Sequence, residues 1–320
     1  MWVIILIIIN DLNQLKIKNK TAIAIGKFDG IHKGHRLILD SILAQKQYGY
    51  KTLAFTFNPS PTAFFSGDKE LSIMSLEEKR REFERIGVDI LIEYPLNKES
   101  ASIEPEKFIT DILINSLNMG YIVAGEDLSF GKEGKGDFKL LESYSIEYGF
   151  EVHKINKIKL NSEIISSTAI KKALLEANLS KANNMLGGHY FLEGIVVDGK
   201  KLGRTLGFPT ANVYPDVNKL LPLYGVYYTK VFIDNKIFNA ITNIGVKPTV
   251  SNEEIPIAET YIYEFSDDIY GKLIRIDFCD YKRPERKYLD INELITALKS
   301  DINDGKKYFE KTAKCTKNKC

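Results

Sequence analysis

The first half of the chain alternates short apolar runs with amphipathic stretches, up to about Asn178. Short apolar runs bounded by polar residues are typical of buried strands, and the stretches between them have the spacing of helices that bury one face. Strands that alternate with helices of this length predict βαβ units, and hence a parallel sheet with helices on both faces. The expected strands are 22–25, 52–57, 90–93 and 121–124, and the expected helices are 34–48, 76–86, 106–117 and 138–148.

An unbroken apolar run occupies residues 2–9 at the start of the chain. A helix that crosses a membrane needs about 20 such residues. No basic segment precedes the run, and no small-residue cleavage site follows it before Asn10. The run therefore predicts a buried first strand rich in isoleucine, in a soluble protein of the cytoplasm.

The pattern changes near residues 182–184, after which short apolar strands follow one another with turns between them. The dipeptide Asp234-Asn235 between two apolar runs indicates a tight hairpin. Strands joined in this way, without helices, predict a small antiparallel β-barrel. The expected strands are 191–197, 225–233, 236–241, 259–265 and 272–278, followed by a helix at 291–303 that ends near Asp304-Gly305. We expect domains at 1–182 and 186–310, with a solvated lysine-rich tail at 311–320.

Composition agrees with two globular domains. The 320 residues include 44% hydrophobic and 27% charged side chains, which excludes a disordered or collagen-like chain. A formal net charge of +2 gives no bulk electrostatic reason to bind nucleic acid or a membrane surface. The 3 cysteines cannot form a disulfide framework or a zinc ribbon, which favours a reducing compartment. The oligomeric state is left open.

One glycine-spaced segment follows the first predicted helix-flanked strand and opens a helix. Residues 26–35 read GKFDGIHKGH, and their glycines allow a ligand to approach the backbone closely. The free N–H groups at a helix start suit a phosphate. His32 and His35 are three residues apart and so share one face of the first turn, where they can donate hydrogen bonds as charge develops on phosphate oxygens. The alternative is that both histidines only cap or pack the helix.

This segment resembles the GxFDGxHxGH signature of the HxGH nucleotidyltransferases, which have a Rossmann-like α/β domain. More narrowly, it is similar to the adenylyltransferase half of the bacterial bifunctional riboflavin kinase/FAD synthetases. Their second signature, ISSTxIR, has its counterpart in the sequence ISSTAIK at 165–171. The resemblance implies catalysis by His32 and His35, and binding of the ATP phosphates by Gly26, Phe28, Asp29, Gly30, Gly34, Ser166, Ser167, Thr168 and Lys171.

Four positions in this half depart from the family pattern. Lys171 stands where the family usually has arginine, and it lacks the planar bidentate fork of a guanidinium. The segment 55–61 resembles the family's TFxPHP, with Ser60 in the place of histidine. The segment 125–131 resembles GxDFxFG, with Leu128 and Ser129 in the places of phenylalanine and arginine. By this resemblance, Asn58 and Asp127 lie beside FMN. The departures leave open that the adenylyltransferase half is weak or inactive.

A second glycine-spaced segment, residues 199–212, opens the predicted barrel. Its glycines permit a loop wrapped around a nucleotide, and Thr210 and Asn212 offer oxygen ligands of the kind that Mg²⁺ accepts. The stretch 203–212, GRTLGFPTAN, resembles the riboflavin kinase signature, and 222–227, 243–249 and 258–262 resemble later family segments in the same order. The resemblance implies an ATP-binding set of Gly199, Lys200, Gly203, Arg204, Gly207, Pro209, Thr210 and Asn212, with Mg²⁺ held by Thr210 and Asn212.

The same resemblance assigns the remaining kinase residues. Glu259 is expected to be the general base for the ribityl 5′-hydroxyl, although an isolated glutamate in a strand is more often a solvated side chain. Arg283 and Glu285 are expected to bind the flavin, and Arg283 could equally be a surface salt-bridge partner. No Walker-type GxxxxGK[ST] sequence occurs in the chain, so a P-loop kinase is excluded.

Together these motifs predict a bifunctional flavin enzyme. The C-terminal barrel would phosphorylate riboflavin to FMN with Mg-ATP, and the N-terminal domain would join FMN to the AMP part of a second ATP, releasing pyrophosphate. Riboflavin, FMN, FAD and ATP are the expected ligands. The alternatives are a kinase with a weak or inactive adenylyltransferase domain, and a flavin- or nucleotide-sensing protein without turnover. Transfer of the nucleotide to a different phosphate acceptor fits poorly with the attached kinase signature.

Overall fold

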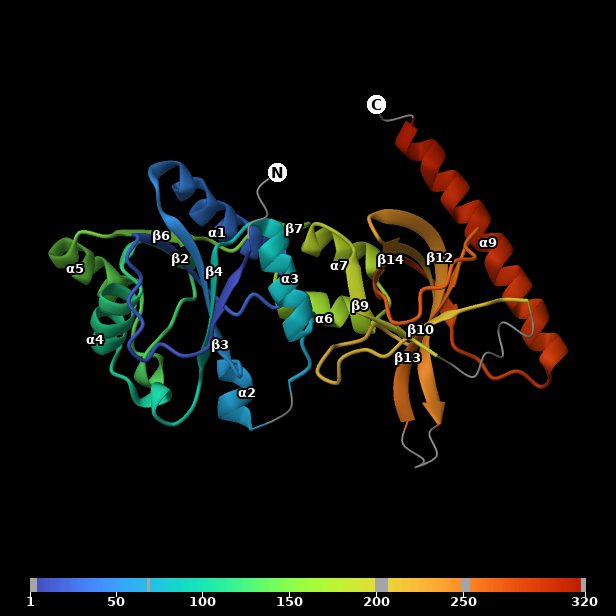
Figure 1. Ribbon diagram of the computed structural model, residues 1–320, viewed down its shortest axis with the longest axis horizontal. Helices are drawn as coiled ribbons and strands as arrows, with labels where there is room; N and C mark the ends of the chain where they lie inside the picture. Colours follow the sequence, from blue (N-terminus) through green and yellow to red (C-terminus); the bar gives the residue numbers. More distant parts are fainter. Residues whose placement is uncertain (1–4, 68–69, 199–206, 249–253, 318–320) are drawn as a thin grey trace. The chain divides into compact units, whose positions relative to one another are not determined.

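The computed structural model describes residues 5–67, 70–198, 207–248 and 254–317 (Figure 1). The chain divides into two compact units, Met1–Ser167 and Thr168–Cys320. The predicted domain boundary near 182–186 stays a prediction, because a compact unit and a functional domain need not end at the same residue. Each unit is described by itself below.

The first unit is built on a parallel six-stranded sheet with the order β1-β4-β3-β2-β5-β6. This confirms the predicted parallel α/β domain. The strands are β1 (Ile7–Ile9), β2 (Thr21–Ile25), β3 (Lys51–Asn58), β4 (Ile90–Pro95), β5 (Met119–Gly125) and β6 (Glu151–Ile155). The helices are α1 (Lys33–Ala44), α2 (Pro61–Ser66), α3 (Leu76–Ile86), α4 (Pro105–Lys107), a π-helix (Phe108–Ser116) and α5 (Phe138–Tyr148), with 3₁₀ turns at Gln45–Tyr48, Ser100–Ser102 and Lys132–Gly134, and a hairpin of β7 (Lys159–Leu160) and β8 (Glu163–Ile164).

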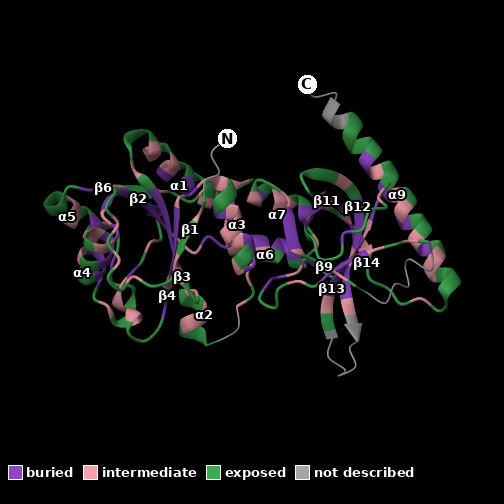
Figure 2. Ribbon diagram, in the orientation of Figure 1, coloured by how far each residue is buried: buried purple, intermediate pink, exposed green. Residues whose placement is uncertain are grey.

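Alternate residues of the strands supply two cores, one on each face of the sheet. Ile23 and Ile25 point to the face covered by the π-helix and α5, where they join one cluster with Phe108 and Leu141. On the other side, α1 packs against β2, β3 and β5 and buries Ile38, Leu39 and Ile42. The buried strands of both units stand out in Figure 2. Because both faces are covered, the ligand-accessible part of this sheet is its edge at the strand ends.

The prediction of a buried first strand is wrong. The strand β1 pairs with β4 alone, at the edge of the sheet, and Ile7 and Ile8 are 55% and 40% exposed. Edge position depends on which strands pair, and the apolar run itself does not encode that. The strand β6 was not predicted, because it lies at the opposite edge of the sheet and its side chains are exposed or half-buried. Its sequence therefore lacks the apolar run of a buried strand.

The order of the strands places a topological switch point between β2 and β5. The chain runs outward from β2 through β3 to β4, and then crosses back to β5 on the other side of β2. In open α/β sheets, ligands bind beyond the carboxyl ends of the strands at such a point. The histidine-containing segment follows β2 directly, so the fold carries this motif to the place where a ligand is expected.

The second unit is a closed barrel whose described strands have the order β10-β13-β12-β11-β14-β9. All of the pairings are antiparallel, which confirms the predicted barrel. Two helices precede it, and a long helix follows it. The elements are α6 (Ser167–Leu175), α7 (Leu179–Leu186), β9 (Tyr190–Val197), β10 (Ala211–Val213), β11 (Gly225–Ile233), β12 (Lys236–Pro248), β13 (Glu254–Ile262), β14 (Leu273–Pro284) and α9 (Ile291–Lys317).

The turn between β11 and β12 is the predicted tight hairpin. Asp234 and Asn235 both have positive φ, 48° and 66°, as a two-residue turn between twisted strands requires. The predicted end of the last helix is wrong, since α9 continues through Gly305 to Lys317. A Cβ at Gly305 would collide with the Tyr263 hydroxyl and the Ile241 side chain. Gly305 is therefore a close-packing position within the helix, and the first residues of the expected tail are helical and exposed.

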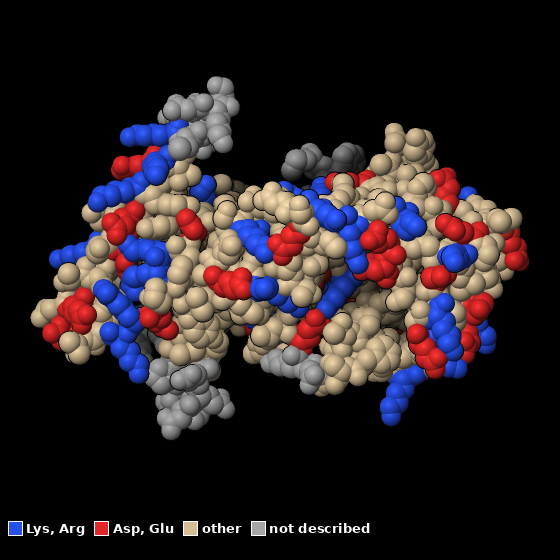
Figure 3. Space-filling view, turned by 180° about the vertical axis from the view of Figure 1, so that it is seen from behind, with Lys and Arg blue, Asp and Glu red and all other residues tan. Residues whose placement is uncertain are grey.

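Acidic and basic side chains are interspersed on the face of the molecule seen in Figure 3, so this face has neither a continuous basic nor a continuous acidic area. This agrees with the small net charge of +2. Among the described residues, none of the helices has the length and apolar character required to cross a lipid bilayer.

Candidate functional sites

A cavity of about 350 Å³ lies in the first unit, at the carboxyl ends of its central strands. Its wall includes Ile25 at the end of β2, Thr56 of β3, Gly125 of β5 and Ile155 of β6. From the glycine-spaced segment come Gly26, Lys27, His32, Gly34 and His35. We call this cavity the first site.

The two histidines form a stacked pair at the start of α1. Their ring centroids are 3.7 Å apart with an interplanar angle of 13°. His32 caps the helix, and its Nδ1 accepts a hydrogen bond from the His35 backbone N–H at 3.3 Å. Because Nδ1 is an acceptor, the proton of a neutral His32 ring is on Nε2. His32 is therefore both a cap and a hydrogen-bond donor, so the two interpretations of the motif are compatible.

Burial keeps both histidines neutral. It lowers the pKa of His32 to about 4, although Asp29 acts in the opposite direction. Burial, together with the positive charges that His32 and Lys79 can carry, holds the pKa of His35 well below its usual value. At pH 7 each ring is thus an uncharged donor. The Nδ1 atom of His35 is buried and has no hydrogen-bond partner among the described residues.

The loop before α1 has an unusual backbone. Phe28 and Ile31 have φ values of 51° and 41°, a region that side-chain-bearing residues rarely adopt, and Gly30 has φ 85°. The surrounding contacts hold this conformation: the Phe28 ring packs on Phe83 and on His35 at 5.4 and 5.3 Å. Strained loops of this kind occur mainly at functional sites, where they fix side chains in place.

Asp29 is a structural link in this loop. Its side chain is buried, and Oδ1 accepts a hydrogen bond from the Ile73 N–H at 2.7 Å. Its carbonyl oxygen accepts one from the Ser167 hydroxyl at 2.9 Å. These two bonds tie the predicted phosphate-binding loop to the segment before α3 and to the second signature.

The remaining predicted residues of the first site fall into three groups. Ser166, Ser167 and Asp127 lie on the cavity wall with Gly26 and Gly34, and Asp127 forms an ion pair with Lys157 at 3.1 Å. Phe28 is buried behind the loop, and Asn58 is an exposed residue at the end of β3. Thr168 and Lys171 lie on α6 and are counted with the second unit, so their roles at this site stay predictions.

Sequence reasoning missed a charged group at the first site. Lys27 lies on the cavity wall and forms an ion pair with Glu70. The other carboxylate oxygen of Glu70 accepts a hydrogen bond from the Ser60 hydroxyl at 2.7 Å. The signal was present, because position 27 is one of the three variable positions of the first signature and carries a lysine here, but Glu70 is 43 residues away in the chain.

A cavity of about 290 Å³ lies in the second unit, between the barrel and α9. We call it the second site. Barrel strands provide Asn243, Glu259 and Tyr261, and α9 provides Leu294, Leu298 and Asp301. Thr210, which precedes β10, and Glu285, which follows β14, complete the polar part of the wall.

Glu259 is the centre of a row of polar residues on paired strands. Asn212 of β10 is its register partner on one side, and Asn243 of β12 is its partner on the other. Residues directly opposite each other in antiparallel strands point to the same face. The barrel therefore aligns the predicted base with one predicted metal ligand. Asn243 was not singled out as a site residue, although its segment was part of the family resemblance.

Arg283 has a defined protein partner. Its Nε and Nη2 donate to the two Asp301 carboxylate oxygens at 3.1 and 2.6 Å, and Nη2 also donates to the Tyr288 hydroxyl at 2.8 Å. Nη1 donates to the Pro284 carbonyl at 3.0 Å, so the described part of the chain leaves one of the five N–H groups for a ligand. The same carboxylate lies 3.2 Å from Lys282. We call this arrangement the Asp301 clamp; it fixes α9 as one wall of the second site.

Part of the predicted kinase loop cannot be compared with the structure. Gly199, Lys200, Gly203 and Arg204 lie outside the described residues. Gly207 has φ 84° and is exposed, as is Pro209. The roles of these six residues in binding ATP stay predictions.

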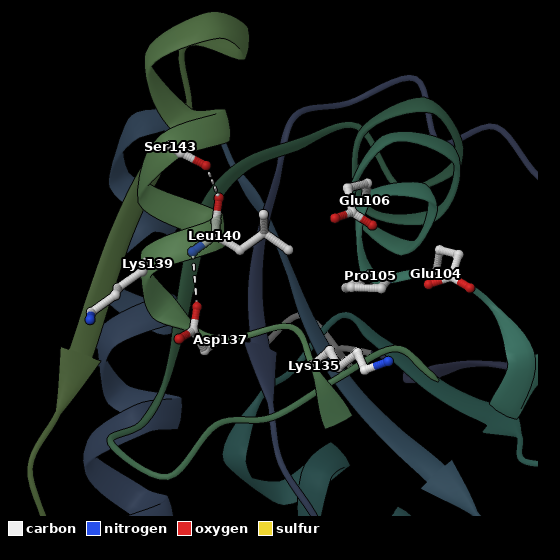
Figure 4. Close-up of a pocket in the computed structure, with 8 residues that line it drawn as sticks. All are labelled: Glu104, Pro105, Glu106, Lys135, Asp137, Lys139, Leu140 and Ser143. Carbon is white, nitrogen blue, oxygen red and sulfur yellow. Dashed lines mark hydrogen bonds between the residues drawn. The ribbon is translucent and has the colours of Figure 1, made fainter. Parts of the chain in front are cut away.

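A third depression, of about 430 Å³, lies between α4 and α5 (Figure 4). None of the residues on its wall is a predicted site residue. Asp137 and Ser143 bond locally, to the Leu140 N–H at 3.0 Å and to the Leu140 carbonyl at 2.7 Å. Figure 4 shows Lys139 directed away from Glu104 and Glu106, so the charged groups do not converge on one point.

The two cavities, one beyond a parallel sheet and one beside a barrel, carry the motif residues predicted for nucleotidyl transfer and for phosphoryl transfer. Residues 14–169 match the family model described as FAD synthetase, and residues 186–309 match the one described as riboflavin kinase. The chain belongs to the family of bifunctional riboflavin kinase/FMN adenylyltransferases. This confirms the resemblance inferred from the motifs.

Relatives of that name are similar over nearly their whole length. The protein of Bacillus subtilis (strain 168) is 35% identical over 300 residues, which are 92% of this chain and 94% of the relative. The one of Haemophilus influenzae is 34% identical over 303 residues, 93% and 97% of the two chains. A solved structure titled as a macrolide-efflux protein from Streptococcus pneumoniae has a TM-score of 0.81 and 30% identity, and the match covers 95% of this chain and 99% of that one.

Proposed function

We propose that the second site phosphorylates riboflavin to FMN and that the first site adenylylates FMN to FAD. The observation that carries the assignment is that each family motif ends on the wall of its own cavity. Glu259 and Thr210 line the cavity beside the barrel, and His32 and His35 line the cavity beyond β2. Two cavities with different chemistry fit two successive reactions better than one.

At the second site, Glu259 would accept the proton of the ribityl 5′-hydroxyl. The hydroxyl oxygen then forms a bond to the γ-phosphorus of ATP, while the bond from that phosphorus to the β-bridging oxygen breaks and ADP leaves. Asn212 and Asn243 flank Glu259 across the strands and would orient the reacting groups. Phosphoryl transfer needs mainly positioning and charge stabilisation, which side chains on rigid paired strands supply.

Magnesium fits the donor atoms near Glu259. Thr210 offers a hydroxyl on the cavity wall, and Asn212 offers an amide oxygen on the strand beside Glu259. Hard oxygen donors of this kind suit Mg²⁺ when most of its other ligands are phosphate oxygens and water. When bound, the ion supplies neutralisation of charge on the ATP phosphates.

At the first site, a phosphate oxygen of FMN would attack the α-phosphorus of ATP. The bond from that phosphorus to the β-phosphate oxygen breaks, and pyrophosphate leaves, so no covalent bond to the protein is needed. His32, neutral and protonated on Nε2, would donate a hydrogen bond to a phosphate oxygen as its charge increases. The stacked His35 holds its partner in place, and the start of α1 adds N–H donors.

Incubation of the full chain with Mg-ATP and either riboflavin or FMN tests this assignment, with the products separated by chromatography. The proposed function predicts FMN and then FAD from riboflavin, and FAD from supplied FMN. FMN without FAD would favour the alternative of an inactive first site, which the departures at Ser60, Ser129 and Lys171 suggest. Tight flavin binding without consumption of ATP would favour a sensor, although a sensor has no need of a base at position 259.

We further propose that this protein works in the cytoplasm, where ATP and a reducing environment are available. Its ligands would be riboflavin, FMN, FAD and ATP, without nucleic acid or a membrane. The interspersed charges on the face in Figure 3 support this, since a polyanion or a membrane surface usually requires a continuous basic area.

A further inference from the structure

The first site lacks two groups that its family resemblance would lead one to expect, a histidine at position 60 and an arginine at position 171. The serine at position 60 has other partners. Its hydroxyl oxygen accepts a hydrogen bond from the Ala63 N–H at 3.2 Å, which caps α2, and donates one to Glu70 at 2.7 Å. Ser60 is thus part of the local structure, and its hydroxyl proton is already used.

Lys27 brings a positive charge to the wall of the first site. It follows Gly26 directly beyond the end of β2 and lies on the cavity wall with His32 and His35. Its ammonium group pairs with Glu70, the residue that also accepts the Ser60 hydrogen bond. Lys27 and Ser60 are therefore attached to opposite oxygens of one carboxylate.

The charge of the cavity wall depends on Lys27. Among the described residues on the wall, Asp127 and Lys157 pair with each other at 3.1 Å. Both histidines are neutral at pH 7, as argued above. Lys27 is the remaining positive side chain on the described wall, and its counter-ion, Glu70, is not among the residues that line the cavity.

The ion pair leaves Lys27 able to bind a second anion. An ammonium group has three N–H donors, and the described residues engage Nζ through one partner, Glu70. The Lys27 side chain is 32% exposed and that of Glu70 is 22% exposed, so the pair is only partly withdrawn from solvent. A phosphate group in the cavity can therefore accept hydrogen bonds from Lys27, in competition with Glu70 for the ammonium group.

We propose that Lys27 binds a phosphate group of the substrates at the first site, and that Glu70 is its counter-ion in the absence of substrate. This inference rests on the proposed function, since it assigns the phosphate to ATP or to FMN. Lys27 would then supply hydrogen-bond donors in place of those that the family's histidine and arginine usually provide at positions 60 and 171. A purely structural role is the alternative, in which the pair fastens the segment after α2 to the end of β2.

Three variants of the full chain separate these roles: Lys27→Gln, Glu70→Gln and, as the matched control, Lys33→Gln. Lys33 is an exposed lysine of the same motif, at the start of α1. One charge-assisted hydrogen bond is worth roughly tenfold to a hundredfold in affinity. We expect Lys27→Gln to raise the KM for ATP or for FMN in FAD formation by that factor, and the substrate whose KM changes identifies the phosphate. Glu70→Gln should leave that KM unchanged or lower it, and Lys33→Gln should leave it unchanged.

Binding of inorganic pyrophosphate, measured by calorimetry, is a second readout that does not need turnover. We expect Lys27→Gln to weaken it by a similar factor and Glu70→Gln to leave it unchanged or strengthen it. Equal losses in Lys27→Gln and Glu70→Gln, or unchanged KM values in Lys27→Gln, would overturn the proposal in favour of the structural role. If the unaltered chain binds pyrophosphate through Lys27 and yet makes no FAD, the proposed function fails while the binding role stands.

Discussion

The two sites of this protein are built on different principles. The first site lies in loops beyond parallel strands, and one contiguous segment provides its two histidines, its backbone N–H donors and Lys27. The second site is formed by side chains on separate antiparallel strands and on α9, so residues from Thr210 to Asp301 meet there. Contiguous motifs can be found in a sequence, whereas a site assembled by strand register becomes visible only in the folded barrel.

The two sites also depend on their surroundings in different ways. The histidines of the first site are neutral because burial disfavours the charged form of each ring, and because two charged rings stacked at 3.7 Å would repel each other. The second site depends on a helix held in place by charge, through the Asp301 clamp. We therefore expect that damage to one site leaves the chemistry of the other unchanged.

Glu259→Gln gives the largest expected effect. Loss of a general base costs roughly 10²- to 10⁴-fold in rate. We expect FMN formation from riboflavin to fall by this factor, while FAD formation from supplied FMN stays at the level of the unaltered chain. Chromatography of both reactions measures this, and a parallel loss of FAD formation in a folded protein would contradict the assignment of separate sites.

The double change His32→Ala with His35→Ala should affect the other reaction. Removal of a donor that stabilises developing negative charge costs roughly 10²- to 10³-fold in rate. FAD formation should therefore fall by at least that much, with FMN formation unchanged. His153→Ala, at an exposed histidine of β6, is the control and should leave both rates unchanged.

Acid should weaken the first unit through His32. The pKa is about 4 in the folded chain and 6.5 for a free histidine, so between these values the unfolded chain binds a proton that the folded chain does not. The free energy of unfolding therefore falls as the pH falls from 6.5 towards 4, by on the order of 3 kcal/mol. Hydrogen exchange of the α1 amides at pH 5 and 7, corrected for intrinsic rates, measures this. In His32→Gln, loss of protection on acidification should be smaller; equal losses would contradict the assignment.

The Asp301 clamp should give the smallest effect, confined to one substrate. Asp301→Asn weakens the bidentate pair, so the wall formed by α9 is held less firmly, and we expect the KM for riboflavin to rise by about tenfold with a smaller change in kcat. Asp304→Asn is the control, because Asp304 pairs with Lys282 at 2.6 Å and its side chain is 44% exposed. An equal effect of both changes would show that the helix needs only general charge balance.

Much of the fold followed from local patterns. Strands such as β3 and β11 were predicted because buried positions dictate apolar residues, and the Asp234-Asn235 turn because positive φ restricts the residue types. Two predictions were wrong: β1 was expected to be buried but is exposed, and the last helix was expected to end near Gly305 but continues past it. Both depend on contacts with distant segments, with β4 in the first case and with Tyr263 in the second.

The sites show the same division. His32, His35 and Glu259 were found because motifs carry them, and the structure places each on a cavity wall. Asn243, Asp301 and Glu70 were missed because strand register, helix docking and a loop contact bring them to the sites. The Arg283 salt bridge, one of the two roles considered for that residue, could be assigned only once its partner was known.

Complementation between two defective variants tests the central claim most directly. Glu259→Gln alone, and the His32→Ala/His35→Ala variant alone, are each incubated with riboflavin and Mg-ATP, and the two are then mixed. Neither alone should form more than traces of FAD, whereas the mixture should convert riboflavin to FAD, because FMN released from one protein is used by the other. Failure of the mixture to make FAD, with both proteins folded, would contradict two independent sites in one chain.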